Sequence, residues 1–221
     1  MISAIVFDFD GLIIDTETPS YIAFKEIYHE YGIDLPLSVY AQCIGTSFQH
    51  FNPYTYLSEQ VNIDEERVRR QFKAKYADLL ELAELRPGVT DYLESAKRLQ
   101  LKIGLASSSN LSWIEPHLKK FEIFPYFDTI QTADLVRNVK PNPELYVRAL
   151  QALEVKGDQA IAFEDSLNGF KAAKAAGLNC VIVPNEVTRH FEFADYDLMV
   201  PSMADKKLDE VIEIIEHRKG A

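Results

Sequence analysis

Four short runs of apolar residues constrain the fold of this chain more than any other feature of its sequence. They cover residues 2–7, 103–106, 160–163 and 180–183, and each precedes a polar or turn-forming segment and then a helical pattern. Runs that are apolar throughout, rather than alternating, are typical of strands buried on both faces of a parallel sheet. This alternation of strands and helices predicts a doubly wound α/β core with right-handed crossovers.

The stretch 16–84 interrupts this alternation, because it contains several helical patterns and no convincing buried strand. One helical pattern covers 20–31, and another covers 64–85 with apolar residues at helical spacing. The sequence therefore predicts two units. Residues 1–15 and 85–221 form the catalytic core, and residues 16–84 form an inserted α-helical cap domain.

Composition excludes several classes of function. The chain has 221 residues, 47% of them hydrophobic, and a formal net charge of −11, which argues against binding to nucleic acid or to a membrane surface. An anionic substrate would need a local cation or helix N-termini to bind. The first residues do not resemble a signal peptide, and no apolar run approaches the ~20 residues that span a bilayer. We expect a cytoplasmic protein and, with no evident apolar stripe left over, a monomer.

Two carboxylates directly follow the first apolar run, at the strand end where open α/β sheets place their ligands. Asp8 and Asp10 are two residues apart on an extended backbone, so they point to the same side, and Gly11 then lets the chain turn away. One carboxylate can attack phosphorus and hold a metal while the other transfers protons. A solvated turn is the alternative interpretation, since Asp and Gly are common in turns.

Three further segments add polar groups. Glu164 and Asp165 follow the third apolar run, and adjacent acids of this kind suit Mg²⁺, although Asp165 could also cap a helix. Ser107 and Ser108 follow the second run and can cradle a phosphate or simply cap a helix. Lys140 precedes a helix, where it can neutralise a phosphoryl group or remain solvated. Together these segments supply every part that phosphoryl transfer needs.

Four segments in this order resemble the motifs of the haloacid dehalogenase-like hydrolases: Asp8-Phe9-Asp10-Gly11, Ser107, Lys140-Pro141 and Glu164-Asp165. The similarity is to the branch that contains phosphoglycolate phosphatase, hexose-phosphate phosphatases and β-phosphoglucomutase, and it covers essentially the whole chain. The resemblance implies a Rossmann-like core with a helical cap inserted after the first strand. It also implies an enzyme of the phosphoric monoester hydrolase class.

The resemblance further implies roles for individual residues. Asp8 would form an aspartyl-phosphate, and Asp10 would protonate the leaving oxygen and later activate the hydrolytic water. Ser107 and Lys140 would hold the phosphoryl group. Mg²⁺ would be bound by Asp8, the main-chain carbonyl of Asp10 and Asp165, with Glu164 assisting directly or through water.

The same resemblance distinguishes between reaction types. Asp10 favours phosphoryl chemistry, because true dehalogenases of the superfamily lack an acid at that position. β-Phosphoglucomutases carry a histidine shortly after the position of Thr16 and an arginine shortly after that of Gly45, and this chain has neither. We therefore expect a phosphatase that acts on a small phosphate monoester, such as a sugar phosphate. A phosphosugar mutase is the alternative. A phosphoacceptor signalling module is less favoured, because such modules are shorter and lack a helical insert.

The cap is expected to set substrate choice by closing over the core site and excluding water. Six residues are candidates for contact with the substrate: Thr16, Glu17, Thr46, Ser47, His50 and Lys73. An ordinary surface or core histidine is the alternative interpretation of His50. Tyr76 and Trp113 are interpreted as packing residues.

Overall fold

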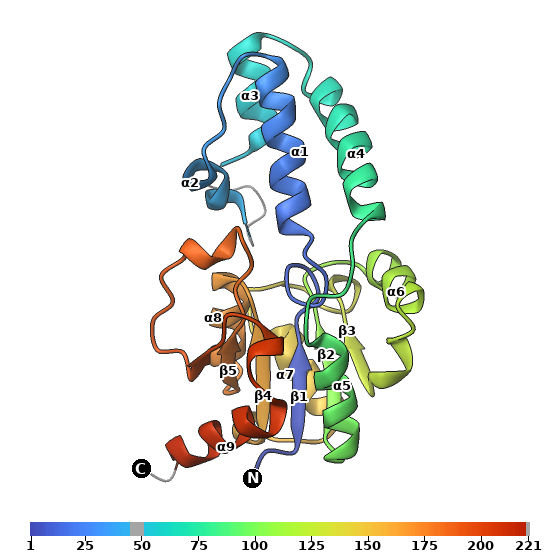
Figure 1. Cartoon of the computed structure of the whole chain (residues 1–221), viewed down its shortest axis with the longest axis vertical. Coiled ribbons are helices and arrows are strands. Elements are labelled where there is room, and N and C mark those ends of the chain that lie inside the picture. Colours follow the sequence, from blue (N-terminus) through green and yellow to red (C-terminus); the bar gives the residue numbers. More distant parts are fainter. Residues whose placement is uncertain (45–50, 220–221) are drawn as a thin grey trace.

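A computed structural model describes residues 1–44 and 51–219 of the chain. It has two parts along its long axis, an α/β core that contains both ends of the described chain and a group of helices beyond the carboxyl ends of the core strands (Figure 1). The core sheet has six strands: β1 (Ala4–Phe7), β2 (Lys102–Ala106), β3 (Thr129–Gln131), β4 (Ala160–Glu164), β5 (Asn179–Ile182) and β6 (Leu198–Met199).

Every neighbouring pair of strands is parallel, in the order β3-β2-β1-β4-β5-β6. The predicted doubly wound α/β fold is confirmed, and β1, β2, β4 and β5 correspond to the four apolar runs. Strand β1 lies in the centre, where Ile5 pairs with Ile103 of β2 and with Ile161 of β4. Strands β3 and β6 are short strands at the two edges, and the apolar pattern does not predict them.

Helices cover both faces of the sheet because alternate strand residues face opposite sides. Ile5 and Phe7 pack in one apolar cluster with residues of α5 (Val89–Arg98), α6 (Leu111–Lys120) and α9 (Leu208–Lys219). Ala4 and Val6 pack in a second cluster with α7 (Glu144–Leu153) and α8 (Leu167–Ala175). The central strands are therefore buried from both sides, as their continuous apolar sequences require.

The helical part follows β1 in the chain. It consists of α1 (Glu17–Glu30), α2 (Leu37–Tyr40), α3 (Pro53–Val61) and α4 (Glu65–Glu81), with one 3₁₀ turn (Ala41–Cys43). These helices pack around an apolar cluster that includes Phe24, Ile27 and Leu57, to which Val187 of the core also belongs. Within the described residues, the segment 16–84 contains no β-strand. The division of the chain at residues 15/16 and 84/85 stays a prediction.

The chain passes between the two parts twice, and polar contacts hold each passage. Before α1, both carboxylate oxygens of Asp15 accept hydrogen bonds from Thr18, one from its amide at 2.9 Å and one from its hydroxyl at 2.7 Å. On the return passage, the Arg86 guanidinium donates to the carbonyl oxygens of Gly11 at 2.6 Å, Val183 at 3.0 Å and Pro184 at 2.7 Å. Arg86 thereby ties the return passage to the loops after β1 and β5.

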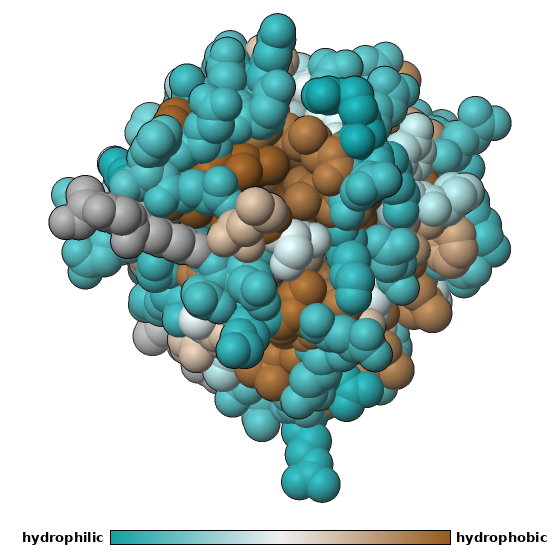
Figure 2. Space-filling model, turned by 90° about the horizontal axis from the view of Figure 1, so that it is seen from below, coloured by the Kyte–Doolittle hydropathy of each residue, from teal (hydrophilic) through white to brown (hydrophobic). Residues whose placement is uncertain are grey.

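The surface away from the helical part carries hydrophobic areas surrounded by hydrophilic side chains (Figure 2). The expected monomer stays a prediction. Among the helices of the described residues, none combines the length and the apolar character needed to cross a membrane.

Two glycines with similar backbone angles, Gly88 and Gly177, differ in how closely other atoms pack against them. Gly88 precedes α5 with φ of +86°, and a Cβ there would lie 2.4 Å from the main-chain nitrogen of Ala204. Gly177 has a similar φ of +82° but no atom within 4 Å of such a Cβ. We expect Gly177→Ala to lower the free energy of unfolding by about 1–2 kcal/mol through left-handed strain. Gly88→Ala should cost about 1–3 kcal/mol more because of the steric clash.

Denaturant-induced unfolding of the two alanine variants measures this difference directly. Equal losses of stability would contradict the packing of Gly88 against the segment 203–204.

Candidate active site

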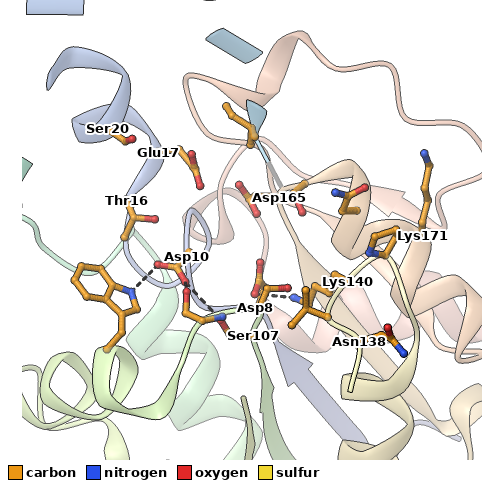
Figure 3. A pocket seen from close by; sticks show the side chains of 18 of the residues that line it. Asp8, Asp10, Thr16, Glu17, Ser20, Ser107, Asn138, Lys140, Asp165 and Lys171 are labelled. Carbon is orange, nitrogen blue, oxygen red and sulfur yellow. Dashed lines mark hydrogen bonds and ion pairs between the residues drawn. The ribbon is translucent and has the colours of Figure 1, made fainter. Parts of the chain in front are cut away.

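A cavity of about 1000 Å³ lies between the core and the helical part, at the carboxyl ends of the strands. The core lines it with Asp8, Asp10, Ser107, Ser108, Ser109, Trp113, Lys140 and Asp165. The other wall is lined by Thr16, Glu17, Ser20, Ile44 and Tyr76. In Figure 3, Asp10 and Thr16 lie on one side of Asp8, Lys140 lies on the other, and Asp165 lies above Asp8 on the side of Glu17. The cavity therefore gathers the polar residues that follow three separate strands.

Lys140 is the centre of the charged network. Its ammonium Nζ lies 2.7 Å from Asp8 Oδ1 and 2.6 Å from Glu164 Oε1, and only 4% of its side chain is exposed. The hydroxyl of Tyr146, on α7, donates a hydrogen bond of 2.6 Å to the same Glu164 oxygen. Burial alone would lower the pKa of Lys140, but the carboxylates of Asp8 and Glu164 outweigh it and hold the pKa above its usual value.

Three buried acids converge beside this lysine. Oxygen atoms of Asp8, Glu164 and Asp165 lie within 4.8 Å of one another. Burial, together with Asp8, raises the pKa of Glu164 to about 7 against the opposing effect of Lys140. Burial and both neighbouring carboxylates raise the pKa of Asp165. One lysine does not neutralise three carboxylates, and their mutual repulsion contributes to the raised pKa values of Glu164 and Asp165.

One oxygen of Asp165 is held and the other is free. Asn185 donates from Nδ2 to Asp165 Oδ2 at 2.7 Å, and the same nitrogen lies 3.2 Å from the carbonyl oxygen of Gly11. Asp165 Oδ1 is buried and has no hydrogen-bond partner among the described residues. Gly11 makes this arrangement possible, since a Cβ at that position would lie 2.3 Å from Asp165 Oδ2.

Asp10 faces a different set of partners. Its Oδ2 accepts a hydrogen bond from the Ser109 hydroxyl at 2.6 Å and a longer one from the Ser107 hydroxyl at 3.4 Å. Its Oδ1 accepts from the indole Nε1 of Trp113 at 2.9 Å. Burial raises the pKa of Asp10, against the hydrogen bonds from Ser109 and Trp113, which favour its charged form. Asp8 and Asp10 thus have distinct environments, one ion-paired and one held by neutral donors.

The residues predicted from the sequence divide into three groups. Those that line the cavity or its acidic cluster are Asp8, Asp10, Thr16, Glu17, Ser107, Ser108, Lys140, Glu164 and Asp165. Lys73 is exposed on α4 and is not among the residues that line the cavity in the described part of the chain. Thr46, Ser47 and His50 lie outside the described residues. The roles assigned to all of these residues stay predictions.

Several residues of the site do not follow from the sequence motifs. They are Arg86, Ser109, Trp113, Tyr146 and Asn185. The interpretation of Trp113 as a packing residue is incomplete, because its indole also bonds to Asp10. Ser109 belongs to the same serine run as Ser107, which is a signal that the sequence does carry. The others become apparent only when distant segments meet in the fold.

Comparison with known proteins identifies the family. The model of the family described as haloacid dehalogenase-like hydrolase matches residues 5–183. The chain belongs to the haloacid dehalogenase-like hydrolases. It is 50% identical over 210 residues to YhcW of Bacillus subtilis (strain 168), which is named as a candidate phosphatase, covering 94% of this chain and 95% of that protein.

Two further relatives extend this comparison. A phosphorylated carbohydrates phosphatase of Thermotoga maritima is 31% identical over 181 residues, covering 79% of this chain and 82% of that protein. The crystal structure of a CbbY mutant from Rhodobacter sphaeroides in complex with xylulose-(1,5)bisphosphate is 31% identical, with a TM-score of 0.71. That comparison covers 95% of this chain and 98% of the CbbY chain. The expected enzyme class, a phosphatase among the hydrolases of this family, is confirmed at that level.

Glu17 gives the site a pH dependence that can be measured as stability. Burial and the carboxylates of Asp10, Asp15 and Asp8 raise the pKa of Glu17 to about 8. An unfolded glutamate has a pKa of about 4.3, so between that pH and about 8 the folded protein binds more protons than the unfolded chain. The contribution of Glu17 to the free energy of unfolding therefore decreases as pH rises through this window.

We expect the melting temperature of the metal-free native protein to fall more steeply from pH 5 to pH 9 than that of Glu17→Gln. Glu59→Gln, at an exposed position of α3, is the matched control and should follow the native protein. A Glu17→Gln variant with the native slope would contradict this assignment.

Proposed function

We propose that this chain is a Mg²⁺-dependent phosphatase of small phosphate monoesters that works through an aspartyl-phosphate on Asp8. The observation that carries the proposal is the convergence of Asp8, Asp10 and Lys140 on one cavity at the carboxyl end of β1. Phosphoryl transfer needs a nucleophile, a proton donor and positive charge around the transferred group, and these three side chains supply one each.

In the first step, an oxygen of Asp8 attacks phosphorus and forms the acyl-phosphate bond while the bond from phosphorus to the ester oxygen breaks. Asp10 transfers its proton to that oxygen, so the alcohol leaves neutral. In the second step, Asp10 takes a proton from water as the water oxygen attacks phosphorus and the bond to Asp8 breaks. Phosphate is released, and both carboxyl groups return to their starting states. The raised pKa of Asp10 supports its role as a proton donor.

Lys140 and the serines provide for the charge of the phosphoryl group. The ammonium of Lys140 already contacts Asp8, so a phosphoryl group on Asp8 would lie within its reach. Ser107 is 1% exposed, and its hydroxyl accepts the amide hydrogen of Ser109 at 3.0 Å, which fixes its orientation. Ser108 is exposed at the cavity, where it would contact the outer oxygens of the substrate.

The residues present fit a magnesium ion. Asp8, Glu164 and Asp165 offer carboxylate oxygens close together, and hard oxygen ligands of this kind suit Mg²⁺. The unpartnered and buried Asp165 Oδ1 supports a ligand at this place, since a buried polar atom without a partner is costly. Asp8, Asp165 and the main chain of Asp10 would hold the ion, with Glu164 assisting. When bound, it would supply the positive charge that offsets the acids and the phosphate.

The helical part is proposed to act as a cap that selects the substrate. Thr16 is buried and Glu17 is half-buried, and both face the cavity near Asp10 (Figure 3). A protonated Glu17 can donate a hydrogen bond to a substrate hydroxyl and an ionised one can accept it, which suits a polyol or a sugar. Thr46, Ser47 and His50 stay candidates for the same role. The relatives named for phosphorylated carbohydrates and crystallised with a sugar bisphosphate support a sugar phosphate as substrate. A cytoplasmic location also stays a prediction.

The nucleophile is tested by phosphate release. A panel of phosphate monoesters, incubated with Mg²⁺, should release phosphate with the native protein and none with Asp8→Asn, because an amide cannot form the acyl-phosphate. Asp91→Asn, at an exposed position of α5, removes a carboxylate outside the cavity and should match the native protein. Turnover by Asp8→Asn at the native rate would refute the assignment. Conversion of a sugar 1-phosphate to its 6-phosphate by the native protein would favour a mutase.

The metal is tested separately from catalysis. Because three buried carboxylates repel one another, we expect added Mg²⁺ to raise the melting temperature of the native protein. Asp165→Asn should reduce that shift strongly, whereas Asp91→Asn should leave it unchanged. A full Mg²⁺ shift in the Asp165→Asn variant would place the ion elsewhere. Phosphate release should stop when the metal is removed with a chelator and return when Mg²⁺ is restored.

A further inference from the structure

Trp113 is the one tryptophan of the chain, and its contact with Asp10 has no counterpart in the motifs. It lies in the first turn of α6, and its indole Nε1 is 2.9 Å from Asp10 Oδ1. The hydroxyls of Ser109 and Ser107 are directed instead to Oδ2, at 2.6 and 3.4 Å. The two oxygens of the Asp10 carboxyl group therefore have chemically different partners.

This difference has a consequence for the proton. An indole N–H only donates, so it needs a lone pair on Oδ1 whether Asp10 is ionised or neutral. A serine hydroxyl both donates and accepts, so it can bond to an ionised Oδ2 and also to a protonated one. In a neutral carboxyl group the carbonyl oxygen accepts more strongly than the hydroxyl oxygen, so the bond from Trp113 to Oδ1 favours the proton on Oδ2. That oxygen is also the one nearer to Ser107, on the side of the expected phosphoryl group.

We propose that Trp113 is a positioning residue, which fixes the rotation of the Asp10 carboxyl group and reserves Oδ2 for proton transfer. The proposal rests on the acid/base role of Asp10 set out above. In the first step, the Oδ2–H bond breaks and the proton moves to the ester oxygen. At the same time the bond from that oxygen to phosphorus breaks and the bond from Asp8 forms. In the second step, a proton of the attacking water returns to Oδ2.

The indole is held from two sides. Within α6, the imidazole ring of His117 lies 4.5 Å from it, and His117 Nδ1 is 2.7 Å from the main-chain oxygen of Trp113. Across the cavity, Tyr76 of α4 lies nearly parallel to it, with ring centroids 6.4 Å apart and an interplanar angle of 20°. Tyr76 stacks in turn on Phe72, and Phe72 on Phe24. The ring that orients Asp10 therefore contacts the helical part as well as the core.

A packing role of Trp113 and an orienting role predict different effects when the residue is replaced. If Trp113 only filled space, its replacement would lower stability and reduce turnover of every substrate alike. If it orients the acid, the loss depends on how much the leaving group needs a proton. An alkoxide leaves poorly without one, whereas p-nitrophenolate leaves without protonation.

The first test uses Trp113→Phe, which keeps an aromatic ring and removes the N–H donor. For the best aliphatic ester of the panel we expect kcat/KM, which reports the first step, to fall about 10- to 100-fold, since misplaced acid catalysis costs factors of this size. For p-nitrophenyl phosphate, whose departure needs no proton, we expect kcat/KM near the native value. Asp10→Asn should show the same selectivity in kcat/KM more strongly. Equal losses of kcat/KM on both esters, or no loss on either, would overturn the proposal.

The second test does not depend on the folding of that variant. A chain with one tryptophan has one indole N–H signal in a ¹⁵N-correlated NMR spectrum. We expect this signal to move upfield in Asp10→Ala, which removes the acceptor, and to stay in place in Asp91→Ala. A signal that is unchanged in Asp10→Ala would overturn the proposal. Negative results in these two tests would overturn only the role of Trp113. Failure of the proposed function is distinguishable, because the native protein itself would then release no phosphate.

Discussion

The site depends on a buried lysine placed between two buried carboxylates. Lys140 contacts Asp8 at the end of β1 and Glu164 at the end of β4, and these two strands are neighbours in the sheet. Removing one partner of a buried ion pair typically costs about 3–5 kcal/mol, because the other charge is left uncompensated. The same contact therefore stabilises the loop before α7 and holds the proposed nucleophile in place. The contacts of Lys140 that stabilise the fold are therefore also those that position the proposed nucleophile.

The site contains more carboxyl groups than the ammonium of Lys140 can neutralise. Asp165 adds a third buried carboxylate with one oxygen held by Asn185 and the other left free. Glycine at position 11 allows that close approach. Such a cluster is tolerable where a bound cation offsets the charge of the acids and of the phosphoryl group. On the other side of the site, Asp10 is surrounded by neutral donors, and there a carboxyl group can gain and lose a proton.

The path of the chain connects this chemistry to the helical part. The segments that enter and leave the helices meet the core beside the catalytic loops, where Asp15 accepts hydrogen bonds from Thr18 of α1 and Arg86 donates to the carbonyl oxygen of Gly11. Trp113 and Tyr76 form a second connection across the cavity. The second connection includes the indole that donates to Asp10.

Much of this arrangement can be predicted from the sequence, because the central strands contain continuous apolar runs and polar residues lie at the ends of three of them. Strands β1, β2, β4 and β5 contain such runs, whereas β3 and β6 are short, lie at the edges and lack a continuous apolar run. Asp8, Lys140 and Glu164 can be found because they sit at strand ends or helix starts.

Trp113, Tyr146 and Asn185 cannot be found in this way. Each acts on a residue far away in sequence, so its partner is defined only by packing. Trp113 and Asp10, for example, are 103 residues apart. Substrate contacts expected at Thr46, Ser47 and His50 fall outside the described residues.

The central claim is that Asp8 carries the phosphoryl group during turnover. The most direct measurement is a rapidly quenched single turnover in the presence of Mg²⁺, followed by mass spectrometry of the digested protein. A phosphoryl group on the peptide that contains Asp8, appearing and decaying at the rate of turnover, is the result predicted here. Phosphoryl transfer to another residue, such as Ser107, or turnover without any phosphorylated peptide, would contradict it.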